Sequence, residues 1–313
     1  MAQQAADGAD GGRRLFRRWL GAHSARAVSV RESESDGFLC TARFEVARKW
    51  SLGLTLVNTV SPEETPEWLA SRAAIEGRLG DAGLSIALFV PRNAPLPAGE
   101  PGISQIADAI AGIETSPDGR LELKREVGML LRRLEADGSV ITITGGLSDR
   151  WAQFTDKVKG TFHLDSRGLF RLPSDETERE AIFDEIVAAC DRTGVDQGLI
   201  VPVVDAWTAV DLEDGGSCVI GTPQLATDES RAALRRNVRR GLQAADARRF
   251  SDVDVTALAV LGAETYAESE RLSWVLRGFD PALYAGYDII VVIADGVVRT
   301  VLEPAAGGVP WDA

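Results

Sequence analysis

The sequence predicts an α/β fold, made of mixed sheets with helices on their faces. Apolar, β-branched runs alternate along the chain with longer segments of helical spacing, and the runs at 84–90 and 287–294 are as apolar as the centre of a parallel sheet. The chain has 313 residues, which is long for one domain. We therefore predict an N-terminal α/β lobe at residues 26–168 and a C-terminal α/β lobe at residues 169–313.

The first residues predict a disordered tail followed by a short helix. Residues 1–12 are small and polar and have nothing to bury, so we expect them to be disordered. Residues 13–25 place Leu15, Phe16, Trp19 and Leu20 on one helical stripe, with arginines around the rest. Docking of this basic amphipathic helix onto its own domain is favoured over binding to a membrane.

The first lobe is expected to follow the order β-β-β-α-β. Asp36-Gly37 predicts a hairpin turn between the first two strands, and Ser61-Pro62-Glu63-Glu64 predicts a helix start. Residues 120–135 fit either a strand or a helix. The remaining elements expected in this lobe are strands at 27–31, 38–47, 52–60, 84–90, 140–144 and 161–164, and helices at 61–79 and 103–113.

The second lobe alternates more regularly between strands and helices. Asp214-Gly215-Gly216 and Asp295-Gly296 predict further hairpin turns. The elements expected here are strands at 169–172, 199–204, 208–212, 217–220, 255–261, 287–294 and 297–302, and helices at 176–191, 228–247 and 264–276.

The composition is that of an acidic globular protein. Lys and Arg number 34 against 47 Asp and Glu, which gives a formal net charge of −13. Such a charge repels phosphate backbones, so nucleic acid is an unlikely partner unless basic residues cluster. The chain has no apolar run of about 18 residues, so we expect neither a signal peptide nor a membrane span.

The cysteines indicate a reducing compartment. Cys40, Cys190 and Cys218 lie far apart and form no C-x-x-C pair, so neither a zinc site nor a disulfide framework is predicted. Free, buried cysteines are the expected state. We expect a cytoplasmic protein that needs no metal or cofactor.

A strand, glycine and helix junction at residues 140–158 is the most suggestive stretch for ligand binding. A β-branched run ends at Gly145-Gly146, and Ser148 could cap a helix whose N-terminal N–H groups would hold an anion. Gly221 and Thr222 follow a second apolar run in the same way. Neither G-x-G-x-x-G nor G-x-x-x-x-G-K-[ST] is present, so glycines that merely turn the chain are the favoured interpretation.

The predicted helix at 228–247 is rich in arginine. Residues 231, 235 and 239 fall on one line of its surface, which makes a basic strip on an acidic protein. The strip could bind an acidic partner or nucleic acid, although a solvated face paired with Asp228, Glu229 and Asp246 is favoured. The arginines concerned are Arg231, Arg235, Arg236, Arg239 and Arg240.

An aromatic segment follows at residues 273–287. Trp274 and Tyr284, with glycines and a proline nearby, could line a groove or an interface. Aromatic side chains that fill the core at a helix-to-strand connection are the simpler alternative, and we favour it.

A nuclease-like arrangement can be tested on the first lobe, whose β-β-β-α-β order resembles in outline the core of restriction-endonuclease-like folds. That core needs an acid and an E-x-K triplet on adjacent strands to hold Mg²⁺. Glu45 is followed by Ala47 where lysine should stand, with Lys49 two positions late. Glu122-Leu123-Lys124 has the right spacing, but its upstream acid, Asp118, sits in the turn leading into it.

No catalytic residue can be assigned from the sequence. The only histidines are His23 and His163, and neither belongs to a recognisable catalytic arrangement, so whether the protein is an enzyme stays open. The favoured hypothesis is a non-catalytic binding or assembly subunit, with a protein partner or self-association through the arginine helix and the aromatic segment. The alternatives are an enzyme or binding protein for a phosphate-bearing ligand at the glycine junctions, and a degenerate nuclease-like nucleic-acid module.

Overall fold

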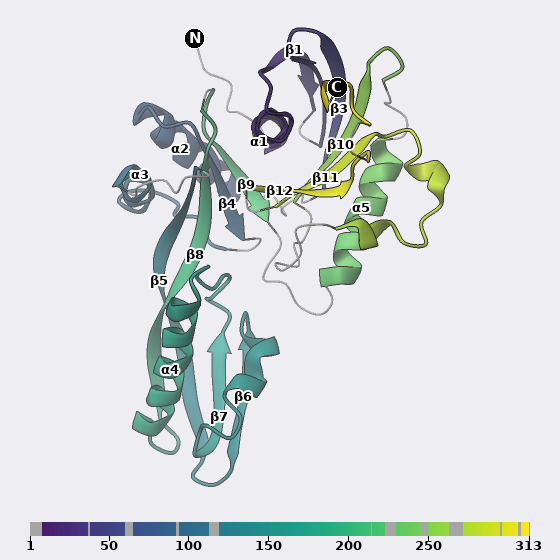
Figure 1. Ribbon diagram of the computed structural model, residues 1–313. Coiled ribbons are helices and arrows are strands. Elements are labelled where there is room, and N and C mark those ends of the chain that lie inside the picture. Colours follow the sequence, from purple (N-terminus) through teal and green to yellow (C-terminus); the bar gives the residue numbers. More distant parts are fainter. Residues whose placement is uncertain are drawn as a thin grey trace. The chain divides into compact units, whose positions relative to one another are not determined.

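The chain folds into mixed sheets with helices on their faces, so the predicted α/β class is confirmed (Figure 1). None of the described helices is long and apolar enough to span a membrane. The structure is a computed structural model, and it describes residues 8–36, 38–59, 65–91, 94–112, 119–213, 215–222, 230–245, 250–262, 272–294, 296–305 and 308–312.

The chain divides into two compact units that are not consecutive halves. Unit 1 comprises residues 1–121 and 208–313, and unit 2 comprises residues 122–207. The division therefore differs from the predicted lobes at 26–168 and 169–313. The physical reason is that the central sheet of unit 1 takes strands from both ends of the chain, with unit 2 inserted between them in the sequence.

Unit 1 contains a six-stranded sheet with the order β1-β2-β3-β10-β11-β12 (Figure 1). The central strands β3, β10 and β11 are parallel, and the outer pairings are antiparallel. This confirms the hairpins predicted at Asp36 and Gly296. The strands are β1 (Val28–Ser35), β2 (Leu39–Val46), β3 (Trp50–Asn58), β10 (Val255–Leu261), β11 (Ile289–Ala294) and β12 (Val297–Leu302).

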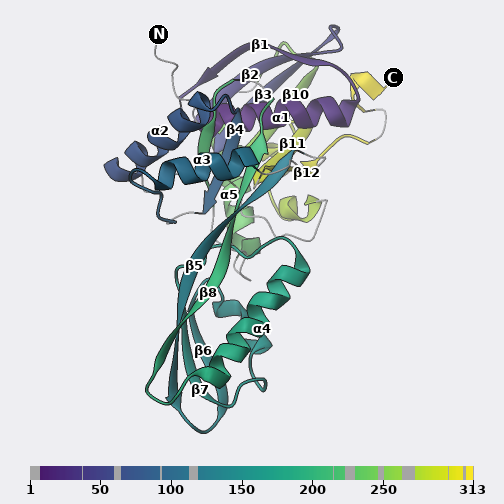
Figure 2. The ribbon, with the colours of Figure 1, turned by 90° about the vertical axis from the view of Figure 1, so that its left-hand side faces the viewer.

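Helices cover both faces of this sheet (Figures 1 and 2). Alternate residues of β10 point to opposite faces, so Ala257 and Ala259 pack on the side of α1 (Gly8–Ser24), and Leu258 and Val260 pack on the side of α5 (Ser230–Ala245). Every residue of β10 and β11 is buried. The apolar runs were therefore correctly predicted as central strands.

The helix α1 begins at Gly8, so the prediction of a disordered tail over 1–12 is wrong for residues 8–12; residues 1–7 lie outside the described residues. The small residues serve close packing. A Cβ atom on Gly11 would lie 2.4 Å from Cys218 Sγ, and one on Gly12 would lie 2.8 Å from Leu56 Cδ1. Glycine there lets the helix approach the strands, at the cost of lower helix propensity.

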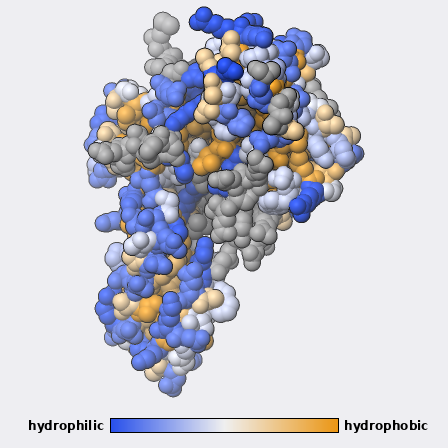
Figure 3. All heavy atoms as spheres, in the orientation of Figure 1, coloured by the Kyte–Doolittle hydropathy of each residue, from blue (hydrophilic) through white to orange (hydrophobic). Residues whose placement is uncertain are grey.

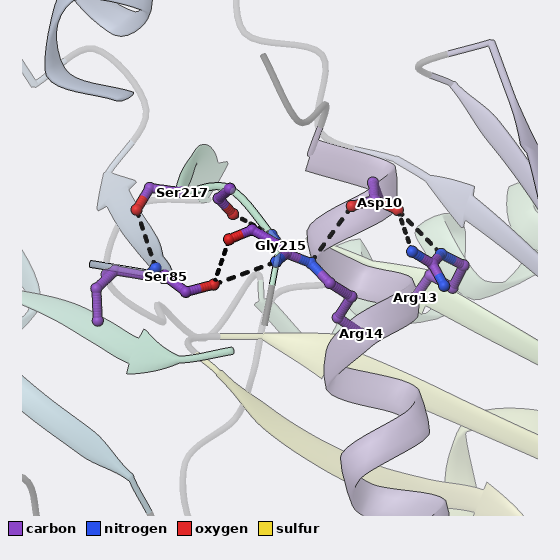
Figure 4. Close-up of polar contacts among 8 residues, drawn as sticks. Asp10, Arg13, Arg14, Ser85, Gly215 and Ser217 are labelled. Carbon is purple, nitrogen blue, oxygen red and sulfur yellow. Dashed lines mark hydrogen bonds and ion pairs between the residues drawn. The ribbon is translucent and has the colours of Figure 1, made fainter. Parts of the chain in front are cut away.

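Arginines on α1 hold the turn before β9 (Cys218–Thr222) (Figure 4). The buried Arg14 guanidinium donates to the carbonyl of Gly216 and to Ser85 Oγ at 3.4 Å, and its Nε lies 3.3 Å from an Asp10 carboxylate oxygen. Ser85 Oγ in turn donates to Gly215 O at 2.8 Å. The basic helix thus docks on its own unit, and its arginines satisfy backbone carbonyls there.

A smaller layer of unit 1 is formed by β4 (Ile86–Pro91), β9 and the end of β8 (Gly198–Asp211). Strand β4 pairs in parallel with β9 and antiparallel with residues 208–211 of β8. It lies between these two strands, so the hairpin predicted at Asp214-Gly215-Gly216 is wrong. The turn connects strands that are not neighbours.

Two helices, α2 (Pro66–Asp81) and α3 (Gly102–Gly112), pack with this layer (Figure 2). The helix α2 begins at Pro66 with Thr65 as its N-cap, because the chain repeats the cap and proline signal four residues after Ser61-Pro62. Residues 61–64 lie outside the described residues. The buried Glu76 carboxylate accepts the Val219 N–H at 2.8 Å and pairs with Arg72, so it joins α2 to β9.

Unit 2 has the strand order β6-β7-β5-β8, with α4 (Glu176–Arg192) packed on the sheet. Residues 120–135, which fitted a strand or a helix, form the single strand β5 (Arg120–Glu135). The strands predicted at 199–204 and 208–212 are one strand, β8, and residues 169–172 form no strand. The other strands are β6 (Ser139–Gly145) and β7 (Gly160–Ser166).

A buried carboxylate organises one end of unit 2. Asp205 accepts the N–H groups of Phe170 and Arg171 at 2.9 and 2.7 Å, and the indole N–H of Trp207 at 2.9 Å. The Arg125 guanidinium lies 4.0 Å from the Trp207 ring centroid. Burial lowers the pKa of Arg125, while the charge of Asp205 acts to raise it. This side chain and a backbone bond from the Ala206 N–H to Arg171 O, at 3.1 Å, hold the segment at 169–172, which forms no strand.

We predict that Asp205→Ala destabilises unit 2 by about 3 kcal/mol, because one buried and two partly buried donors lose their acceptor and Arg125 loses its nearby charge. Asp205→Asn should cost less, since its amide oxygen still accepts. Hydrogen exchange of the Phe170 and Arg171 amides measures the loss locally. Asp184→Ala, at an exposed position of α4, is the control, and equal exchange in the two alanine variants would contradict the prediction.

The three cysteines are buried and form no disulfide with each other. Burial raises the pKa of Cys190 and of Cys218 to about 12 because a low-dielectric surrounding disfavours the thiolate.

We predict that an aromatic disulfide reagent at pH 8 labels Cys190 and Cys218 only after the protein unfolds, since about one thiol in ten thousand is ionised there. The absorbance of the released thiolate counts the labelled cysteines with and without denaturant. Rapid labelling of either cysteine in the native protein would contradict the burial.

Candidate functional site

The glycine junction after β6 uses its backbone donors internally. Gly145 has φ +104°, and a Cβ atom there would lie 2.4 Å from the backbone nitrogen of Arg167. The N–H of Gly146 donates to Ser166 O at 3.3 Å, and the N–H of Leu147 donates to Ser166 Oγ at 3.1 Å. These contacts fit the interpretation that the glycines turn the chain beside β7.

The element that follows this junction is shorter than expected. Ser148 is exposed and begins the 3-10 helix η1 (Ser148–Gln153), whose N-cap, Leu147, makes no side-chain capping bond. Two turns of 3-10 helix carry a much smaller dipole than the longer helix that the anion hypothesis assumes. Trp151 of this segment is exposed, whereas Phe154 and Val158 pack into the core of unit 2.

The second predicted junction lies within a strand. Gly221 and Thr222 are the last residues of β9 and pair with Val90 and Pro91 of β4. The side chain of Thr222 and residues 223–229 lie outside the described parts of the structure. The described contacts of Gly221 and Thr222 are strand pairings, and they give no evidence of ligand binding at this junction.

The arginine helix and the aromatic segment, predicted separately, contact each other in unit 1. Arg235 of α5 donates to Trp274 O at 3.3 Å and to Arg277 O at 2.6 Å. Its guanidinium carbon lies 5.0 Å from the Phe279 ring centroid, and that of Arg239 lies 4.8 Å from the same ring. Arg235 is thus an anchor between α5 and residues 273–279, while Arg239 is exposed above buried Phe279.

The aromatic segment forms two short 3-10 helices, η3 (Ser273–Leu276) and η4 (Pro281–Leu283). Only the end of the helix predicted at 264–276 is described, because residues 263–271 lie outside the described residues. Trp274 and Tyr284 are half-buried and pack against the core that α5 shares with the sheet. Both side chains therefore pack against the core, as the favoured interpretation of the sequence predicted, and both also remain partly accessible to solvent.

Besides Arg235, α5 and the aromatic segment carry four arginines that form an exposed basic surface. We define the α5 surface as Arg236, Arg239, Arg240 and Arg277, all exposed. In the parts of the chain that the structure describes, no carboxylate lies within 4.0 Å of these four guanidinium groups. The side chain of Arg231, and the acids Asp228, Glu229 and Asp246 expected to pair with the helix, lie outside the described residues.

Arg277 is the residue of this surface that sequence reasoning missed, and it lies two residues before Phe279, the ring that Arg235 and Arg239 contact. Both stand in the aromatic segment, in Leu276-Arg277-Gly278-Phe279, where Gly278 has φ +73°. An arginine next to a turn glycine and an aromatic residue was the available signal. Their proximity to α5 could not be read from the sequence, because it depends on tertiary packing.

The E-x-K triplet of the nuclease hypothesis is engaged in structural contacts. Glu122 accepts the Ser174 N–H at 2.9 Å, and Lys124 pairs with Glu178 at 2.5 Å, which raises the pKa of Lys124. Both contacts join β5 to the beginning of α4. Within the described ranges, no group of three or more His, Cys, Asp or Glu residues could hold a metal ion.

Hydrophilic residues predominate on the face shown in Figure 3, as expected for a chain with 81 charged residues, the sum of 47 acidic and 34 basic ones. The fold and the site define an α/β protein with an exposed basic surface beside half-buried aromatic side chains. Comparison with known proteins found no matching family model, curated protein or solved structure.

We predict that Arg235→Ala destabilises the protein by about 1–2 kcal/mol. The carbonyl groups of Trp274 and Arg277 lose a charged donor, and the Phe279 ring loses its cation–π contact with Arg235. Arg236→Ala should change stability by less than about 0.5 kcal/mol because its side chain is exposed. Thermal unfolding of the two variants side by side measures the difference. Equal unfolding temperatures would show that Arg235 is not an anchor.

Proposed function

We propose that the protein is a non-catalytic binding or assembly subunit whose α5 surface binds an acidic protein face, on a partner or on a second copy of the chain. The observation that carries this proposal is the group of four exposed guanidinium groups without a described carboxylate partner. On a chain with a net charge of −13, this group makes a local basic surface that would attract an acidic protein face.

The side chains around this surface suit a protein interface. Arginine, tryptophan and tyrosine are the residues most enriched among those that dominate binding energy. The α5 surface combines exposed guanidinium groups with the partly accessible rings of Trp274 and Tyr284, and Arg235 holds the two elements together. Because Arg235 joins the two elements, binding would have to order the arginine side chains but not the backbone that carries them.

An acidic protein is favoured over nucleic acid as the partner. The net charge of the chain repels a phosphate backbone at long range, and only this local surface opposes that repulsion. The phosphate-ligand and nuclease hypotheses gain no support from the contacts at Gly145, Gly146 and the E-x-K triplet. The proposed location is the cytoplasm, because the described cysteines are free thiols.

We predict that Arg236→Glu/Arg240→Glu weakens self-association, or binding to a poly-glutamate peptide, by at least about tenfold. Arg150→Glu/Lys157→Glu, at exposed positions of unit 2, makes the same charge change elsewhere and is the matched control. Sedimentation measures self-association, and fluorescence anisotropy measures peptide binding, each at low and moderate salt.

Three outcomes would contradict the proposal. The wild-type chain could neither self-associate nor bind the acidic peptide at low salt. The two double variants could weaken binding equally, which would indicate a net-charge effect. A thymidine oligonucleotide could bind more tightly than the peptide through the same arginines, which would favour a nucleic-acid module.

A further inference from the structure

A cavity of about 520 Å³ lies in unit 1 beside α1 and the C-terminal segment. Its wall includes Trp19 and His23 of α1, Glu303 after β12, and Val309, Trp311 and Asp312 near the C-terminus. The volume falls in the range that accommodates small-molecule ligands. Neither the arginine helix nor the glycine junctions contribute to it, so it is independent of the proposed function.

The aromatic part of the wall is held in place by stacking. The rings of Trp19 and His23 lie nearly parallel, with centroids 4.7 Å apart and planes at 15°. Trp19 also contacts Phe16 in the core, at 5.5 Å between centroids. Trp311 is buried, and its carbonyl oxygen accepts from the Arg26 guanidinium at 3.5 Å. Both tryptophans are therefore fixed before any ligand arrives.

The charged part of the wall is acidic. Glu303 and Asp312 contribute two carboxylates, and Glu303 Oε2 lies 3.8 Å from His23 Nε2. Carboxylates next to tryptophan rings and an apolar wall favour a positive charge, because the carboxylates attract it and the ring electrons stabilise it. The same carboxylates repel an anion.

We propose that this cavity binds a small organic cation with an apolar body, of the arylalkylammonium or alkylammonium class. The apolar body would contact Trp19, Val309 and Trp311, and the ammonium group would face Glu303 and Asp312. The two features have separate consequences, because the apolar wall determines whether a ligand of this size enters and the carboxylates determine its charge.

Three probes of the same shape test the proposal: benzylammonium, benzyl alcohol and benzoate. We predict saturable binding of benzylammonium with a Kd of about 1 mM or tighter, binding of the alcohol at least about tenfold weaker, and no binding of benzoate. Calorimetry measures the affinities. In a ¹⁵N-labelled sample, the indole N–H signals of Trp19 and Trp311 should move with the cation and locate it without any substitution.

Glu303→Gln/Asp312→Asn should weaken benzylammonium binding by at least about tenfold, while Glu34→Gln/Glu126→Gln, at exposed positions outside the cavity, should leave it unchanged. Glu303→Gln alone serves if the double variant does not fold. Equal affinity for the alcohol and the ammonium would overturn the proposal. So would unchanged binding in the cavity variant, indole signals that do not move, or no saturable binding of the cation.

Discussion

The parallel pairing of β3 with β10 is the constraint on which the architecture of unit 1 depends. It joins Leu52 to Val255 at one end and Asn58 to Leu261 at the other, across about 200 residues of sequence. The Asp254 carboxylate accepts both the N–H and the hydroxyl of Ser51, at 2.7 and 2.8 Å, and so supports the register where β10 begins. Closing so long a loop is entropically costly, and the fully buried strand offsets that cost.

This pairing explains which parts of the fold could be predicted from the sequence. Local signals were sufficient where an element depends on its own side chains, as in α4, where Asp175 caps the helix and Ile182 and Ile186 face the core. They were insufficient for partner choice. The apolar patterns of β3 and β10 indicate burial, but many strands share them, so the sequence suggested two consecutive lobes. Hydrophobic periodicity carries no information about which buried strands lie side by side.

The sequence also left open whether the small residues of α1 and the arginines of α5 pack against the fold or face solvent. Residues 8–12 have the composition of a flexible tail, yet Gly11 and Gly12 lack side chains where Cys218 and Leu56 lie close to the helix. Helical spacing placed Arg235 and Arg239 on one line, but could not show that Arg235 meets two carbonyl groups while Arg236, one residue away, is exposed. In both cases the sequence shows what a residue is able to do, and the tertiary neighbours determine whether it packs or faces solvent.

The arginines of α1 and those of α5 differ in the groups that they contact. Arg14 and Arg18 donate to the carbonyls of Gly216 and Asp211, so their charges satisfy acceptors that the fold itself exposes. Within the described chain, no backbone carbonyl or carboxylate accepts a hydrogen bond from Arg236 or Arg240, and both side chains are exposed. Arg236 and Arg240 are therefore side chains that the described contacts of the fold leave available, which is what the proposed binding requires.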